Sequence, residues 1–208
     1  QLFVSDKSRK GWLYMSKIQL KPGTMLYPVP AVMVSCSHNG DNNIITIAWT
    51  GIICSDPPML YISVRPERHS FEMIKNTGDF VVNLPNKKLC KALDFCGVKS
   101  GREVNKFEYL SLTPEKSNFV TSPSIGEAPL SLECKVKDII PLGSHHMFIS
   151  DIVGVSVDEG LMDEKQKIHL SKADLICYNH GEYWSLDETL GFFGYSIRKK
   201  QKIKRERG

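Results

Sequence analysis

A short run of anion-binding side chains, SVRPERHS (residues 63–70), separates an apolar stretch from a segment with helical spacing. If the apolar stretch is a strand, Ser63 and Arg65 lie on the same face of it, and the following proline ends it. Ser70 is a favourable N-cap for a helix over 71–77. Free N–H groups at a helix N-terminus suit phosphate, particularly beside cationic side chains. The candidate phosphate ligands are Arg65, Arg68, His69 and Ser70. The stretch alone equally allows a surface turn with solvated arginines.

The preceding segment, NIITIAWTGIICSDPP (43–58), has features of a site for a flat ligand. In an extended chain one face would carry Thr46, Ala48 and Thr50, and the other Ile45, Ile47 and Trp49. The small residues and the glycine after Thr50 let an aromatic ring approach the backbone and accept hydrogen bonds from its N–H groups. Packing of Trp49 in the core is an equally good interpretation.

Strand patterns dominate the elements that must position these residues. We expect strands over 31–37, 43–49, 59–65, 80–85, 132–142, 146–157 and 174–178. The Asn-Gly in HNGDN predicts a hairpin with a loop slightly longer than two residues, and Gly143-Ser144 predicts a second hairpin. Helices are expected over 71–77, ending at Gly78, and over 86–97. The pattern favours a mainly β fold, a barrel or closed sheet with a few peripheral helices, over a parallel α/β sheet.

The composition excludes several classes of function. The net charge is +4, but the tail 198–207 holds seven Lys/Arg and one Glu, which leaves 20 basic and 22 acidic residues in the rest of the chain. We therefore interpret the tail as a solvated charge run and consider nucleic acid an unlikely partner. The six cysteines form no CxxC and no zinc spacing, so no metal site is expected. No GxGxxG follows a strand, so any NAD(P)H would dock transiently.

Residues 1–14 read as an upstream extension before Met15, followed by one domain over 15–197 and the basic tail 198–208. No apolar run is long enough for a membrane span or a signal peptide, which suggests a cytoplasmic protein without membrane contact. His145 and His146 are expected to be solvated in a turn. No acid–base pair stands out, so no catalytic side chain is assigned.

The stretch TIAWTGIICSDPPMLYISVRPERHSFEMIKNTGDFVVNLP (46–85) resembles the signature region of the flavin reductase-like family. Its sequence is most similar to that of the flavoredoxin branch. The resemblance continues through DFCGVKSGREVNKF (94–107) and YWSLDETLGFFGYS (183–196), and it covers about residues 20–196. It implies the fold of that family, an antiparallel, Greek-key-like, FMN-binding split β-barrel.

The resemblance also implies non-covalent FMN at a homodimer interface. Thr46, Ile47, Ala48 and Trp49 would line the isoalloxazine through backbone groups, and Ser63, Val64 and Arg65 would lie under the ring and ribityl chain. The phosphate would meet Arg68, His69 and Ser70, with Lys106 and Ser100 as further contacts. Asn83 would be a polar contact or a turn residue. Phe193 and Tyr195 would cap the site, from the partner subunit, or pack as a strand in the core.

The implied function is that of an oxidoreductase. Electrons would pass from NAD(P)H or a redox partner protein through bound FMN to an acceptor, as in an NAD(P)H-dependent flavin reductase. The alternative is a non-catalytic carrier of electrons or flavin.

Overall fold

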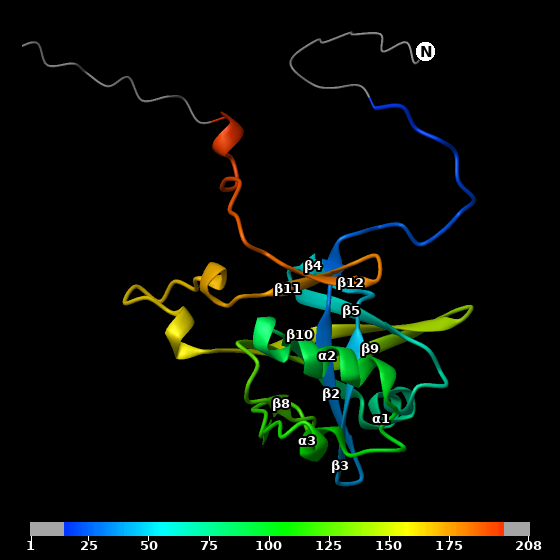
Figure 1. Cartoon of the computed structure of the whole chain (residues 1–208). Helices are drawn as coiled ribbons and strands as arrows, with labels where there is room; N and C mark the ends of the chain where they lie inside the picture. The colour runs from blue at the N-terminus through cyan, green and yellow to red at the C-terminus, as the bar shows by residue number, and fades with distance from the viewer. Residues whose placement is uncertain (1–14, 198–208) are drawn as a thin grey trace, which may run out of the picture.

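The structure, a computed structural model, describes residues 15–197, so the expected extension 1–14 and the basic tail 198–208 lie outside the described residues (Figure 1). An antiparallel seven-stranded sheet forms the body. Its strands, in spatial order, are β3 (Asp41–Ile47), β2 (Val32–His38), β6 (Asp79–Leu84), β9 (Leu130–Leu142), β10 (His145–Val157), β5 (Pro58–Val64) and β4 (Thr50–Ser55). The mainly β fold expected from the sequence is confirmed.

Smaller elements surround this sheet (Figure 1). A second sheet contains β1 (Val29–Pro30), β11 (Ile176–Asn179) and β12 (Glu182–Ser185), and a third pairs β7 (Pro114–Glu115) with β8 (Ser124–Ile125). The helices are α1 (His69–Thr77), α2 (Cys90–Val98) and α3 (Lys106–Tyr109), and the 3₁₀ turns are Lys87–Leu89, Glu159–Leu161, Leu170–Lys172 and Tyr195–Ile197. No helix within 15–197 is long and apolar enough to cross a membrane.

The two edge strands of the large sheet, β3 and β4, are consecutive in the chain and are joined only by Ala48 and Trp49. Three Cα–Cα steps span at most about 11 Å, so the sheet must curl until its edges lie close together. The backbone N–H of Ser63 donates to the Trp49 carbonyl at 2.9 Å. We call Ala48–Trp49 the seam, because it is where the barrel remains split.

Two apolar clusters fill the space on either side of β2, since that strand is buried on both faces. The barrel interior is closed at one end by α1, which contributes Phe71 and Ile74. The second cluster lies under α2 and includes Met33 and Leu93. Burial of both faces fixes β2, and with it the adjacent β3 that leads to the seam.

Turn chemistry explains several boundaries. Asn39 and Gly40 both have positive φ, 53° and 88°, as a two-residue type I′ hairpin requires, so the β2–β3 loop is shorter than expected. Gly78 ends α1 in a left-handed conformation, with its N–H bonded to the Ile74 carbonyl, which confirms the expected stop.

The structure corrects or narrows the sequence prediction at three points. The extended segment 43–49 breaks at the seam, and β4 then forms a separate strand. Of the two interpretations left open for Trp49, core packing is the wrong one, because the side chain is 40% exposed. The helix expected over 86–97 divides into a 3₁₀ turn and α2.

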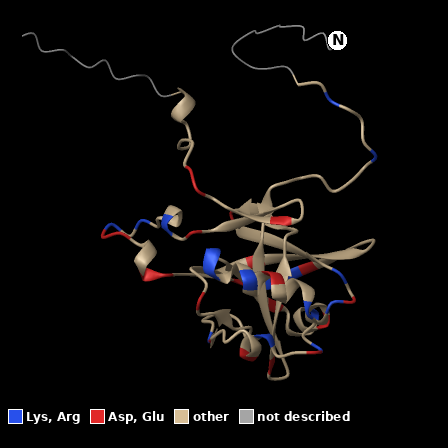
Figure 2. Ribbon diagram, in the orientation of Figure 1, with Lys and Arg blue, Asp and Glu red and all other residues tan. Residues whose placement is uncertain are grey.

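Apart from Tyr27, which packs on Tyr178, and Asp187, which pairs with Lys87, the described ends of the chain, 15–28 and 186–197, extend away from the body on the side of β11 and β12 (Figure 1). Figure 2 shows few charged residues along them. Their exposed apolar side chains are Met15, Ile18, Leu20, Met25, Leu26, Leu186, Leu190, Phe192, Phe193, Tyr195 and Ile197. Phe193 and Tyr195 therefore do not pack into the core of this chain, which is one of the two interpretations left open by the sequence.

Candidate functional site

Two adjoining pockets lie where β3, the seam, the end of β5 and the start of α1 come together. One, of about 510 Å³, is bordered mainly by charged and polar side chains; we call it the basic pocket. The other, of about 400 Å³, is bordered by the seam and by aromatic rings; we call it the aromatic pocket. Ile45, Arg65 and Arg68 line both, so the two form one continuous site.

The basic pocket carries an excess of positive charge. Its cationic side chains are Arg65, Arg68, Lys99, Arg102 and Lys106, against the carboxylates of Glu67 and Glu103. Arg65 pairs with Glu67 at 3.1 Å, and Arg102 donates to the backbone carbonyl of Glu67 at 3.0 Å. The Arg68 guanidinium makes no hydrogen bond or ion pair within residues 15–197. Arg68 is thus the cation best placed to bind an incoming anion.

The start of α1 forms one wall of the basic pocket, but Ser70 is not its N-cap as the sequence predicted. Arg68 holds the N-cap position with extended backbone, and Ser70 lies inside the first turn. The Ser70 hydroxyl is buried and accepts a hydrogen bond from the Asn43 amide at 2.8 Å. This contact ties the first turn of α1 to β3.

Lys106 stabilises the wall of the basic pocket that β3 and α2 form. The side chain is only 2% exposed, and its ammonium donates to the Ile44 carbonyl at 2.6 Å and to the Cys96 carbonyl at 2.8 Å. Burial lowers the pKa of Lys106. Because β3 supplies one acceptor and α2 the other, Lys106 joins the two elements that border both pockets.

His69 should report on the positive field of the basic pocket. Burial and the nearby Arg102 and Lys106 cations lower its pKa from the ordinary 6.5. The unfolded chain then takes up a proton near 6.5 that the folded chain resists, so this residue's contribution to stability is lost as pH falls through that range. We expect the melting temperature of the protein without ligand to fall less between pH 7.5 and 5.5 in His69→Gln than in the wild type.

The same field can be read directly from the His69 ring by NMR. Its titration midpoint should lie below 6.5 in the protein without ligand, and it should rise when a bound anion such as inorganic phosphate offsets the neighbouring cations. A midpoint at or above the ordinary value, unmoved by either anion, would contradict the assignment of the pocket.

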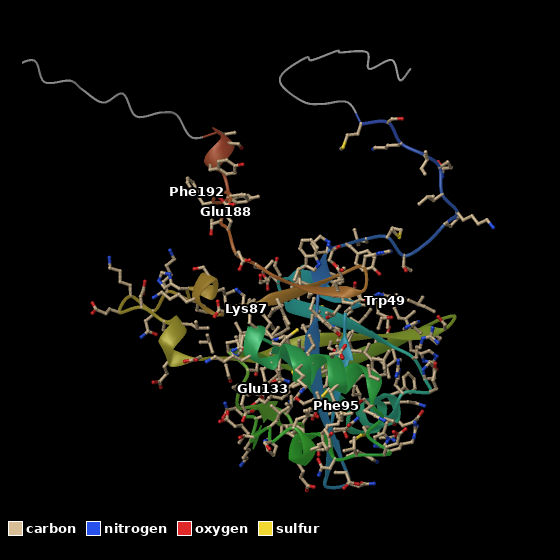
Figure 3. All side chains as sticks on the ribbon, in the orientation of Figure 1. Trp49, Lys87, Phe95, Glu133, Glu188 and Phe192 are labelled. Carbon is tan, nitrogen blue, oxygen red and sulfur yellow. The ribbon has the colours of Figure 1, made fainter. Side chains whose placement is uncertain are left out.

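Aromatic rings form two walls of the aromatic pocket. Trp49, labelled in Figure 3, packs on His145 with ring centroids 4.6 Å apart. A second group of rings, Tyr27, Tyr178 and Tyr183, also lines the pocket, and Tyr178 contacts the other two. His145 and its neighbour, which contacts Phe71 at 5.0 Å, are therefore not the solvated turn residues expected from the sequence.

The floor of the aromatic pocket is the seam. Ladder pairing ends at Ile47 and resumes at Thr50, so the backbone between them lies outside the antiparallel ladder. Thr46 is fixed by a hydrogen bond to the Leu93 carbonyl, and Gly97 of α2 lies so close that an added Cβ would be 3.2 Å from the Thr46 Cβ. This close packing of Gly97 on Thr46 leaves the backbone of the seam uncovered beside an apolar surface.

The structure brings together the cofactor-binding residues proposed from the sequence except Asn83, while Phe193 and Tyr195, the proposed caps, border neither pocket in this chain. The aromatic pocket is lined by Thr46, Ile47, Ala48, Trp49, Ser63 and Val64, and the basic pocket by His69, Ser70, Ser100 and Lys106, with Arg65 and Arg68 in both. Asn83 borders neither pocket. Its buried amide bonds the Met33 carbonyl, the Ser131 hydroxyl and the Ile125 N–H instead, which holds β8 against the sheet.

Sequence reasoning missed several lining residues. Arg102 lies in the quoted SGREVNKF stretch, so a signal existed there. Asn43, Asp94 and Tyr183 also lie in stretches singled out from the sequence. Nothing in the local sequence marks Tyr27, His145 and Tyr178. They reach the site only because the small sheet and the β9–β10 hairpin fold against the barrel.

The arrangement fits a flavin mononucleotide in its chemistry. A phosphate dianion needs several N–H donors and net positive charge, which the basic pocket supplies. A flat ring needs apolar surface and backbone donors, which border the adjoining pocket. No group of three or more His, Cys, Asp or Glu side chains that could hold a metal occurs within residues 15–197.

Comparison with known proteins agrees with this assignment. The family model for the flavin reductase like domain matches residues 24–186. A protein of Aquifex aeolicus is 31% identical over 166 residues, 77% of this chain and 85% of the relative. Among solved structures, flavoredoxin of Desulfovibrio vulgaris (Miyazaki F) has a TM-score of 0.82 at 30% identity, covering 88% of this chain and 100% of that one. Flavoredoxin from Methanosarcina acetivorans has a TM-score of 0.81 at 25% identity, with the same coverage.

The fold is therefore that of the split barrels found in flavin reductase-like proteins. The chain belongs to the flavin reductase-like family, as the resemblance of residues 46–85 had indicated.

Proposed function

We propose that the chain binds one FMN across the two pockets and works as a flavin reductase or flavoredoxin-type oxidoreductase. The observation that carries this proposal is the continuity of a cationic pocket with an aromatic one through Arg65 and Arg68. A phosphate and a ring joined by a short polar chain match that layout. Electrons would enter from NAD(P)H or a protein donor and leave to an acceptor.

In this proposal, residues at different places in the site have different roles. Arg68, Arg102 and the first turn of α1 hold the phosphate, while Lys106 keeps that wall in place. The seam offers backbone groups to the ring, Ser63 fixes the seam through its bond to the Trp49 carbonyl, and Trp49 and His145 limit access of water to the ring. When bound, the flavin supplies the hydride and single-electron chemistry, so the chain needs only to bind it and to set the field around it. No catalytic side chain is assigned.

An absorbance spectrum of the purified protein, followed by anaerobic titration with NADH and NADPH, tests the proposal. We expect flavin bands that bleach at a rate compatible with turnover. Bound flavin that neither nucleotide reduces would favour the alternative function, a carrier that receives electrons from a protein partner. A protein that stays colourless after incubation with excess FMN would overturn the proposal.

We also propose that the protein forms a homodimer. The exposed apolar side chains of 15–28 and 186–197 support this, as do Ile52 and Ile53, which are exposed on the edge strand β4. Phe193 or Tyr195 of one protomer would then reach the aromatic pocket of the other. Light scattering should give twice the mass of the chain, and a monomer that retains full FMN occupancy would contradict the interface.

A further inference from the structure

One carboxylate, that of Asp94, lines the aromatic pocket. It lies on α2 and accepts a hydrogen bond at 3.0 Å from the hydroxyl of Tyr183 on β12, 89 residues away in the chain. The pair therefore links a helix of the body to the small sheet at the mouth of the pocket. Neither residue is needed for the phosphate or for the backbone contacts described above.

The direction of this hydrogen bond decides what the pair can offer a ligand. A phenol has one proton, and Tyr183 gives it to Asp94, so the phenol oxygen presents only lone pairs to the pocket. Burial and the contact with Asp94 raise the pKa of Tyr183, which keeps the phenol protonated. The second carboxylate oxygen of Asp94 makes no hydrogen bond within residues 15–197. Together the two side chains accept hydrogen bonds and donate none to a ligand.

The other charged groups of the aromatic pocket are Arg65 and Arg68, which also face the basic pocket. A phosphate bound there would engage them. His145, the remaining titratable group besides the tyrosines, has its pKa lowered by burial and by Arg65, so it is mainly neutral at pH 7. A second ring that lies beside Asp94 would then meet a negative charge.

Building on the proposed function, we propose that Asp94 and Tyr183 select the substrate that meets the flavin. They admit aromatic compounds with a neutral N–H donor, such as a ring carboxamide, and they disfavour compounds with a carboxylate in its place. An amide N–H gains an acceptor there, whereas a carboxylate meets a like charge. A pyridine carboxamide, the head group of a nicotinamide nucleotide, belongs to the favoured class.

Nicotinamide and nicotinate are suitable probes because they differ only in this group. Their dissociation constants would be measured on the FMN-loaded protein from changes in the flavin spectrum, and by ligand-observed NMR on the flavin-free protein with inorganic phosphate present to engage Arg65 and Arg68. We expect the wild type to bind the amide about tenfold more tightly than the acid. In Asp94→Asn this preference should fall to less than about threefold, and in Tyr183→Phe the amide should bind more weakly while the acid is little affected.

Glu182→Gln is the matched control, because Glu182 is the neighbouring residue of β12, lies outside the pocket lining and bonds Trp184. It should keep the wild-type preference. Equal affinity of the wild type for both probes, or an unchanged preference in Asp94→Asn, would overturn the inference. A large loss of FMN affinity in Asp94→Asn would also overturn it, because the pair would then serve the flavin ring. Failure of FMN binding in the wild type would count against the proposed function alone, since the probes are also measured on the flavin-free protein.

Discussion

Arg68→Ala is expected to weaken FMN binding by about 10- to 100-fold. Its guanidinium borders both pockets and has no hydrogen bond or ion pair within residues 15–197 to compete with a ligand. Hydrogen bonds between charged groups contribute roughly 1.5–3 kcal/mol, and about 1.4 kcal/mol corresponds to a tenfold change in affinity. Quenching of FMN fluorescence on titration with protein measures the effect, and the difference from the wild type should shrink at high salt.

Lys75→Ala is the matched control for this variant. Lys75 lies in the last turn of the same helix, is half exposed and pairs with Glu72 at 3.8 Å. Its removal should leave the FMN dissociation constant within about twofold, because surface ion pairs contribute little. If Arg68→Ala retains wild-type affinity while the protein is folded, the phosphate does not bind at the start of α1.

Lys106→Met is expected to lower the free energy of unfolding by about 2–4 kcal/mol. The substitution keeps the length and the apolar stem of the side chain but removes the ammonium that satisfies the carbonyls of Ile44 and Cys96. Each buried acceptor left without a partner costs roughly 1–3 kcal/mol, partly offset because a buried cation no longer has to be desolvated. Urea denaturation of the flavin-free protein, analysed with a constant slope, measures the change.

The same variant separates a structural role of Lys106 from direct contact with the phosphate. Lys91→Met, at an exposed position of α2, should leave stability nearly unchanged. If Lys106→Met lowers FMN affinity but not stability, Lys106 contacts the ligand itself, as the family resemblance implied. If it lowers neither, the carbonyls of Ile44 and Cys96 have other partners, and Lys106 does not hold β3 and α2 together.

The strands and turns could be predicted from the sequence where local backbone chemistry determines their ends. Asn39-Gly40 and Gly78 require positive φ, and both turned out to end an element. The seam was not readable. The run from Ile44 to Cys54 stays apolar or small throughout, so no local signal shows that the chain leaves one edge of the sheet at Ala48 and joins the opposite edge at Thr50.

The candidate site, too, could be predicted from the sequence only in part. Arg65, Arg68 and His69 stand next to one another in the chain, so their clustering could be predicted from spacing alone. The aromatic wall could not, because Tyr27 and Tyr183 each contact Tyr178 only through the pairing of β1, β11 and β12, which the sequence did not reveal. Asn83 is the opposite case, since a polar residue in an apolar strand suggested a ligand contact but holds together a buried network.

The position of the seam has a mechanical consequence. The place where the barrel could come apart is also the floor of the aromatic pocket, so separating β3 from β4 would destroy the ring site. A ligand bound at the seam would hold β3 and β4 together, and its release would weaken the contact between these strands. Amide hydrogens flanking Ala48 and Trp49 should therefore exchange with deuterium more slowly in the loaded protein, while those of the distant β6–β9 pair keep the same rate.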